Sequence, residues 1–148
     1  MKSGEKVELT EEQIKSIAGD LECGMKVYVN IETREIKSII NLDESIYADE
    51  EVWKEDIKEI EENFEKYLEF EKMDSSESFQ VMEEFVESVR DEELRKKLEL
   101  GLSLSKPFRN FKDIIDDEGK YRAKWFAFKS AKYIDYVKEQ LDNYNKTQ

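Results

Sequence analysis

Residues 106–115 read KPFRNFKDII, and residues 121–129 read YRAKWFAFK. The only proline of the chain lies in the first segment, where the first turn of a helix would tolerate its missing N–H group. Phe108 and Phe111 follow it at helical spacing. After an acidic turn, the second segment opens a long final helix that we expect to reach about Tyr144. The end of the chain is therefore predicted to be helical.

The final helix is predicted to be apolar on two sides. The first side holds Tyr121, Trp125, Phe128 and Tyr136, and the nearly opposite side holds Phe126, Tyr133, Val137, Leu141 and Tyr144. A helix with two apolar sides is usually packed on both of them. Either the helix runs through the middle of a helical layer, which is the favoured interpretation, or one side meets another chain or a ligand.

The first half of the chain combines a helix with strands. Thr10-Glu11-Glu12-Gln13 fits a capping box, and Gly24 is placed to end the helix that this box begins. Residues 25–31 alternate between apolar and polar side chains, as a half-buried strand does. Residues 36–42 form a second β-rich run, so the two runs are predicted to pair as a hairpin. Residues 67–72 alternate again and predict a third strand.

A strongly acidic segment, residues 43–63, separates the second strand from the third. Trp53, Ile57 and Ile60 keep helical spacing within it. The segment is therefore predicted to form an amphipathic helix with a narrow apolar stripe, and a partly ordered insertion is the alternative.

Helical patterns fill the rest of the chain. One helix is expected to start at Ser75 or Ser76, and Asp91 is placed to cap the next. The fold class is therefore α+β, with an N-terminal helix, a small antiparallel sheet of about three strands and a mainly helical C-terminal half. We expect a single domain over residues 1–148, made of a lead-in (1–9), a helix with antiparallel strands (10–72) and a helical part (75–148).

The composition limits the available chemistry. The chain of 148 residues has a net charge of −13 and no histidine. Without histidine, His-based proton relays and His-ligated metal sites are excluded, and Cys23 alone is a poor basis for a zinc site. Asp113, Asp116, Asp117 and Glu118 do not match a calcium loop and indicate an acidic turn at a helix end. We therefore expect no metal and no cofactor.

The single cysteine also bears on the compartment. Cys23 cannot form an intramolecular disulfide, and we expect it to be half-buried at a helix end. No stretch is long and apolar enough to span a membrane, and the N-terminus lacks the apolar segment of a signal peptide. These features predict a cytoplasmic location and no membrane partner.

The charges are unevenly distributed along the chain. Residues 105–148 hold ten Lys/Arg and seven Asp/Glu, whereas residues 1–104 hold fourteen and thirty. The basic third either neutralises acids of the same chain or faces a partner. The candidate binding residues are Arg109, Lys112, Arg122, Lys124, Lys129 and Lys132.

Aromatic residues lie among these cations. Phe108, Phe111, Trp125 and Phe128 could form a stacking surface for bases, with the cations on phosphates. Aromatic residues at helical spacing are more often core residues, and the negative net charge opposes binding of nucleic acid. We therefore expect the four aromatic residues to be core anchors.

The pattern of residues 106–113, followed by Trp125-Phe126-Ala127-Phe128, resembles the C-terminal motif of the uncharacterised bacterial protein family UPF0158. Residues 82–85 and 94–98 look like the preceding helices of that family. Residues 28–30 with 33–35 look like its early hairpin, where Arg34 replaces a glycine that the family commonly has. The resemblance implies a small bacterial protein, and it supplies neither an activity nor a catalytic residue.

Three classes of function remain open. The favoured one is a non-enzymatic protein-interaction or adaptor domain that binds a protein partner or a second copy of itself. The alternatives are a nucleic-acid-associated protein that uses the C-terminal basic aromatic face, and a small enzyme that works without histidine. The missing histidine, the missing glycine-rich phosphate loop and the two-sided helix favour the first class. No catalytic residue can be singled out among the thirty-seven acids.

Overall fold

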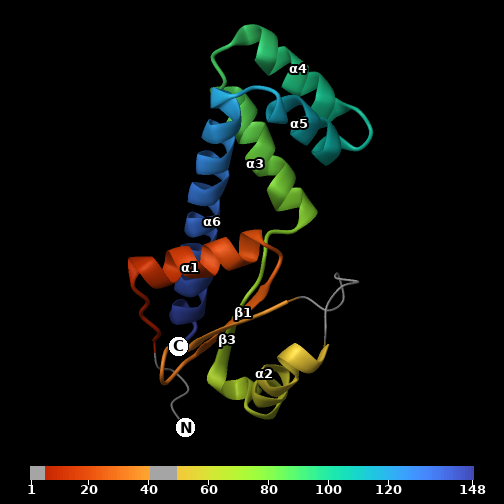
Figure 1. Cartoon of the computed structure of the whole chain (residues 1–148). Helices are drawn as coiled ribbons and strands as arrows, with labels where there is room; N and C mark the ends of the chain where they lie inside the picture. Colours follow the sequence, from red (N-terminus) through yellow and green to blue (C-terminus); the bar gives the residue numbers. More distant parts are fainter. Residues whose placement is uncertain (1–5, 41–49) are drawn as a thin grey trace. The chain divides into compact units, whose positions relative to one another are not determined.

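The computed structural model of the chain describes residues 6–40 and 50–148 (Figure 1). The chain divides into two compact units. Unit 1 comprises Met1–Lys72 and Tyr133–Gln148, and unit 2 comprises Met73–Lys132. The single domain over residues 1–148 stays a prediction.

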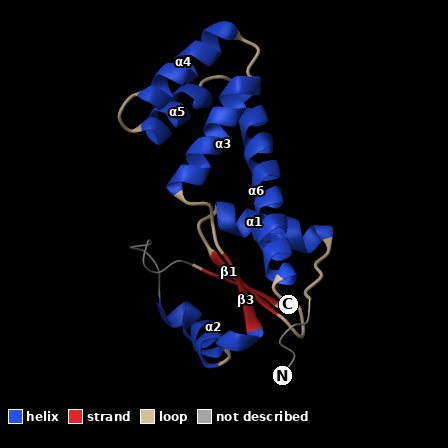
Figure 2. Cartoon of the chain, turned by 180° about the vertical axis from the view of Figure 1, so that it is seen from behind, coloured by secondary structure: helices blue, strands red, loops and turns tan. Residues whose placement is uncertain are grey.

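Unit 1 contains a three-stranded antiparallel sheet with the strand order β2-β1-β3 (Figure 2). Its elements are α1 (Glu11–Glu22), β1 (Lys26–Asn30), β2 (Ile36–Ile39), α2 (Glu50–Glu62), a 3-10 turn (Phe64–Lys66), β3 (Tyr67–Phe70) and the last part of α6 (Lys120–Lys146). The predicted α+β class, the hairpin and the third strand are confirmed.

The local signals of the sequence set the bounds of α1. Thr10 Oγ1 accepts a hydrogen bond from the Gln13 N–H at 3.1 Å, and Gln13 Oε1 accepts one from the Thr10 N–H at 2.9 Å. The predicted capping box is therefore present. Gly24 follows the helix with a φ of 84°, in the left-handed region that a glycine adopts at little cost.

The two faces of the sheet are covered by different helices. Val27 and Val29 of β1 are fully buried on one face, which Ser38 joins to α1 by a hydrogen bond from its hydroxyl to Asp20. The other face carries Lys37, which contacts Asp56 of α2. In both views of the ribbon, α1 lies on one side of the strands and α2 on the other (Figures 1 and 2).

The helix predicted in the acidic segment 43–63 is confirmed as α2. Ile60 is buried and Ile57 is half-buried, while Lys54 and Lys58 are exposed. The narrow apolar stripe therefore faces the sheet. The first part of the segment, up to residue 49, lies outside the described residues.

Unit 2 is helical. It consists of α3 (Ser75–Ser88), α4 (Glu92–Ser103), α5 (Pro107–Asp116) and the first part of α6. The α3 helix begins at Ser75 as predicted, with Asp74 as its N-cap. Asp91 caps α4 by accepting a hydrogen bond from the Leu94 N–H at 3.1 Å. Pro107 occupies the first turn of α5, as its missing N–H group predicts.

An aromatic cluster forms the core of unit 2. The Phe85 ring lies 6.3 Å from Phe111, 5.3 Å from Trp125 and 5.5 Å from Phe128, measured between ring centroids. Phe111 and Trp125 are buried, as expected of core anchors, and Phe128 is half-buried. The prediction is wrong for Phe108, which is 42% exposed. Its ring pairs with that of Phe79, at 6.3 Å between centroids, instead of entering the cluster around Phe85, so part of it stays open to solvent.

The two apolar sides of α6 are used one after the other along the helix. Trp125 is buried in the part that belongs to unit 2, and Tyr133, Val137 and Leu141 are buried in the part that belongs to unit 1. At 3.6 residues per turn, the buried stripe moves by roughly a third of a turn between these parts. Phe126 lies on the second side but within unit 2, and it is 44% exposed.

Candidate functional site

The six basic candidate residues lie on α5 and on the first part of α6, all within unit 2. Helical geometry does not gather them on one surface. Arg122 and Lys129 share a face of α6, whereas Lys124 lies on nearly the opposite face. The remaining members, Arg109, Lys112 and Lys132, are on α5 and further along α6.

Three of the six cations pair with acids of the same unit. Lys112 Nζ lies 2.9 Å from Asp116 Oδ2, and Arg122 Nε lies 3.2 Å from Asp116 Oδ1. Lys132 Nζ lies 2.8 Å from Glu84 Oε2. The hydrogen bond from Lys112, together with that from Arg122, lowers the pKa of Asp116, so this carboxylate stays charged at neutral pH.

The other three cations have no carboxylate within ion-pair distance in the part of the chain that the structure describes. They are Arg109, Lys124 and Lys129. The Lys124 ammonium lies 5.1 Å from the centre of the Tyr121 ring, a cation–π contact within its own helix. A binding role for the six residues stays a prediction. Only three of them have no ion pair that a partner would have to break.

An apolar surface lies elsewhere on unit 2, where α4 ends and α5 begins. Leu100 is 61% exposed and Leu104 is 55% exposed. Phe108 follows four residues after Leu104 and is also exposed. A single exposed apolar side chain is ordinary, but large ones close together in the chain mark a surface that a partner could cover.

A groove of about 350 Å³ runs beside this surface, between α3 and α4. Its residues are Phe79, Glu83, Val86, Glu87, Glu99, Leu102 and Ser103. The four residues from α3 recur at the spacing of one helical stripe. Leu104 directly follows the groove residue Ser103, and Phe108 contacts the groove residue Phe79. Phe108 therefore adjoins the groove, and Leu104 is next to it along the chain.

The groove was not predicted from the sequence, although the sequence contains part of the pattern that forms it. Phe79 and Val86 are recognisable as one stripe of α3, and Glu83 and Glu87 stand on the same stripe. Sequence periodicity does not give the distance between α3 and α4. That distance decides whether the side chains of the stripe are covered by α4 or remain accessible.

A second hollow, of about 230 Å³, lies in unit 1 between the sheet and α2. It is lined by Lys26, Tyr28, Ile39, Ile40, Ile57, Ile60 and Glu61. Burial, with the negative charges of Glu69 and Glu71, raises the pKa of Tyr28. A raised pKa keeps the phenol protonated at neutral pH, so Tyr28 is not prepared to act as a general base.

Neighbouring groups of the sheet have pKa values shifted in the same direction. Burial and a hydrogen bond with Glu59 raise the pKa of Tyr67, whose hydroxyl lies 2.8 Å from Glu59 Oε2. Burial and the charge of Glu71 raise the pKa of Glu69. The Tyr67 contact joins β3 to α2 and suits a structural role.

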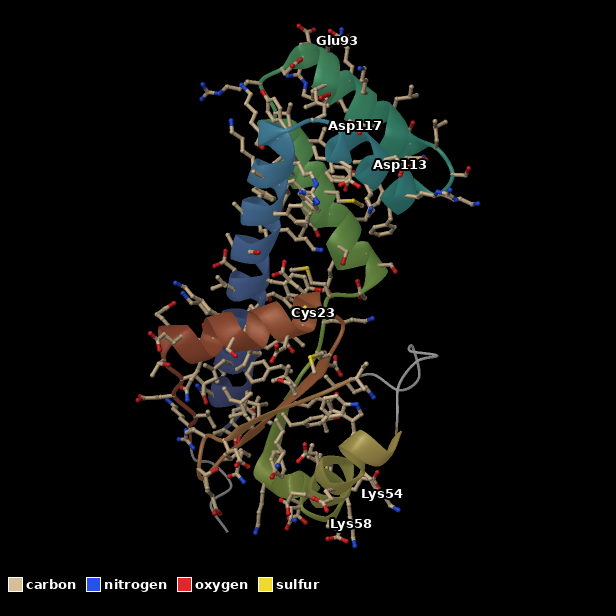
Figure 3. The ribbon with its side chains drawn as sticks, viewed as in Figure 1. Cys23, Lys54, Lys58, Glu93, Asp113 and Asp117 are labelled. Atoms are coloured by element: carbon tan, nitrogen blue, oxygen red, sulfur yellow. The ribbon has the colours of Figure 1, made fainter. Side chains whose placement is uncertain are left out.

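Cys23 and the acidic turn are both exposed. Cys23 is the C-cap of α1 (Figure 3), and it is exposed, where a half-buried thiol was expected, because the chain leaves the helix there and turns into β1. Asp113 is exposed on α5, and Asp117 is exposed at the C-cap of that helix (Figure 3). Within residues 6–40 and 50–148, no three His, Cys, Asp or Glu side chains are grouped closely enough to hold a metal ion. None of the described helices is long and apolar enough to cross a membrane.

A family model described as "Uncharacterised protein family (UPF0158)" matches residues 35–147. The matched residues include every element from β2 to α6, and therefore both the groove and the aromatic cluster. Residues 28–30 and Arg34, which resemble the early hairpin of the family, precede the match. Neither the curated proteins nor the solved structures yield a match to the chain.

Proposed function

We propose that this chain, which belongs to the UPF0158 family, is a protein-interaction domain whose docking surface lies on unit 2. The observation that carries the proposal is the exposure of Leu100, Leu104 and Phe108 beside the groove between α3 and α4. Burying one large apolar side chain contributes roughly 1.5–3 kcal/mol. Because the three residues are 42–61% exposed, a partner that covered them would gain roughly half of that amount from each, a partial contribution to specific association.

The chemistry of the chain supports a non-enzymatic role. Histidine is absent, and the Tyr28 phenol in the hollow of unit 1 is held protonated. That hollow is lined by a single lysine and a single carboxylate, Lys26 and Glu61, besides Tyr28 and four isoleucines. An acid–base pair of the kind that hydrolases use is therefore not assembled in it.

The cellular compartment is also part of the proposal. Cys23 is an exposed free thiol, which a reducing bacterial cytoplasm would preserve. In that setting the domain would act as an adaptor that holds a second protein.

Site-specific crosslinking in cells tests the docking surface. A photoreactive amino acid replaces Leu104 in the full chain, and a matched control carries it at Glu93, an exposed position in the first turn of α4 (Figure 3). We expect a protein to be crosslinked at position 104 and not at position 93. Binding of that protein in purified form should then weaken by about tenfold in the variant Leu100→Ser/Leu104→Ser, a change of roughly 1.4 kcal/mol.

Other outcomes count against the proposal. Equal capture at both positions, or unchanged affinity of the double variant, would show that the exposed leucines bind nothing specific. Capture of RNA instead of protein would favour the nucleic-acid alternative, and RNA binding should then fall in Arg109→Ala/Lys129→Ala. Because Leu100 and Leu104 are more than half exposed, their replacement by serine should leave the thermal unfolding midpoint nearly unchanged.

A further inference from the structure

We infer that the groove between α3 and α4 binds a basic amphipathic helical segment of a partner protein. The inference rests on the proposed function and names the chemistry of the partner. It is carried by the combination of an apolar floor with acids at its edge, two of which, Glu83 and Glu87, make no ion pair among the described residues.

The floor of the groove is apolar. Val86 is buried, and Phe79 and Leu102 are half-buried, so their side chains still present apolar area to a ligand. Phe108 continues this area past Phe79. A helix that enters such a groove uses apolar side chains at positions i, i+3 or i+4, and i+7. The floor therefore requires a partner with an apolar stripe.

The edge of the groove is acidic and only weakly neutralised. Glu83 and Glu87 are exposed, and neither makes an ion pair within the described residues. Glu99 lies 4.0 Å from Arg95 Nε, and its side chain remains 59% exposed. Two lysines of unit 2 pair with acids outside the groove, since Lys132 contacts Glu84 and Lys96 contacts Glu92.

These charges select a basic partner. Three carboxylates beside an apolar floor attract Lys or Arg placed next to an apolar stripe, and they repel acidic segments. The net charge of −13 adds long-range attraction for a basic segment.

A second copy of the chain fits the groove less well than a basic partner. Two copies would each carry the charge of −13 and repel one another. Of the six basic candidates in unit 2, Lys112, Arg122 and Lys132 already pair with their own acids. The unpaired Arg109, Lys124 and Lys129 are divided between α5 and two different faces of α6, so a second copy does not present them as one basic stripe. The occupant is therefore a different protein.

Fluorescence anisotropy with a designed peptide tests the inference on the full chain. The probe is a labelled helical peptide with Leu and Phe along one stripe and Lys and Arg elsewhere. A second peptide replaces every Lys and Arg by Glu, and a third keeps the basic composition in scrambled order. We expect only the ordered basic peptide to bind specifically, with affinity that falls as salt is raised.

Variants of the chain locate the binding. Glu83→Gln/Glu87→Gln should weaken binding of the ordered basic peptide by about tenfold, a coupling typical of charges at an interface. The matched control, Glu93→Gln/Asp113→Asn, removes the same charge from exposed positions of α4 and α5 away from the groove (Figure 3). Its affinity should stay within about twofold of the unaltered chain. All four positions are exposed, so equal thermal midpoints would show that each variant is folded.

Three results of the peptide experiment would overturn the inference. They are binding of the acidic peptide as tight as that of the basic one, binding of the scrambled peptide as tight as that of the ordered one, and an equal loss of affinity in both double variants. A dimer in sedimentation that Glu83→Gln/Glu87→Gln weakens and Glu93→Gln/Asp113→Asn does not weaken would assign the groove to a second copy. If crosslinking at position 104 captures a protein that binds through an acidic or neutral segment, the inference fails and the proposed function stands. If no protein is captured there, the proposed function fails.

Discussion

Asn145 holds Val7 by two hydrogen bonds. The Val7 N–H donates to Asn145 Oδ1, and Asn145 Nδ2 donates to the Val7 carbonyl, each at 2.9 Å. Val7 is fully buried, so its backbone groups have to be paired inside the protein. An amide side chain can accept one bond and donate the other. The described end of the lead-in is therefore fixed to the last turns of α6.

Replacing Asn145 by Asp should destabilise unit 1. The carboxylate would still accept the Val7 N–H, but it would turn a second acceptor towards the Val7 carbonyl and leave that buried carbonyl without a donor. We expect the free energy of unfolding in urea to fall by about 1–3 kcal/mol. Asn143→Asp adds the same charge at an exposed position two residues earlier and should change it by less than about 0.5 kcal/mol. Equal losses in the two variants would contradict the role of the Val7 contact.

The contact between α4 and α5 depends on Gly101. A Cβ at this position would lie 3.0 Å from Ile114 Cδ1 and 3.4 Å from Asn110 Cβ, and the Gly101 carbonyl accepts a hydrogen bond from Asn110 Nδ2 at 3.0 Å. Gly101→Val should therefore lower the stability by about 1–3 kcal/mol through overpacking.

Gly19 is the matched control for Gly101. It also lies inside a helix, but a Cβ added there would have no neighbouring atom within 4 Å. Gly19→Ala should raise the stability by roughly 0.5–1 kcal/mol, because alanine is the better helix former. Urea unfolding of the two variants measures both effects. A loss of similar size at both positions would show that the close approach at Gly101 is unimportant.

The hairpin turn is strained at Arg34. Its φ of 67° lies in the left-handed region, which costs a residue with a Cβ about 1–2 kcal/mol. Arg34→Gly should relieve this cost and raise the stability by roughly 0.5–1 kcal/mol, after the added freedom of the unfolded chain is subtracted. Arg34→Ala keeps the strain and loses the hydrogen bond from Nη2 to the Lys6 carbonyl, so it should not stabilise. Thermal unfolding of both variants distinguishes the effect of backbone strain from the effect of losing the guanidinium group. If Arg34→Ala is as stable as Arg34→Gly, or more stable, strain at this position is not the cause.

The ion pair between Lys37 and Asp56 predicts a loss of stability at alkaline pH. The hydrogen bond to Asp56 raises the pKa of Lys37 above its ordinary value of 10.5, against the opposing effect of burial. A raised lysine pKa gives stability that is complete below the unfolded value and is lost as the pH rises through the folded value. Lys37→Met should therefore cost about 1 kcal/mol at pH 7, and the difference from the unaltered chain should shrink above about pH 10.

Lys58 provides the control for this pH dependence. It lies 4.0 Å from Glu62, its side chain is 73% exposed, and it points away from α2 into solvent (Figure 3). Lys58→Met should change the stability by only about 0.3 kcal/mol at any pH. If urea unfolding between about pH 7 and pH 11 shows the same difference for Lys37→Met at every pH, the ion pair is not its cause.

The sequence predicts the elements of this fold because their signals are local. The capping box at Thr10, the cap at Asp91 and the glycine after α1 each involve residues within a few positions of one another. The pairing of Lys112 with Asp116 is predictable from the sequence for the same reason, since the two residues are four positions apart on one helix.

Features that depend on distant parts of the chain were not accessible in this way. The bonds between Val7 and Asn145 join residues 138 positions apart, and no periodicity marks them. The two apolar sides of α6 were visible, but their division between two units was not, because each side is chosen by the residues that surround it. Phe108 kept the spacing of a core residue and is nevertheless exposed, since no described element of unit 2 fully covers its ring.

The discontinuity of unit 1 has a consequence for synthesis on the ribosome. Unit 2 is one uninterrupted segment, so all of its residues have been made once Lys132 is added. Unit 1 begins earlier but needs the residues from Tyr133 on, which are made after unit 2. Its strands therefore emerge first and wait for Val137, Leu141 and Asn145 before their core can close. The order of completion is the reverse of the order of emergence, so the nascent sheet stays without part of its core until unit 2 has been made.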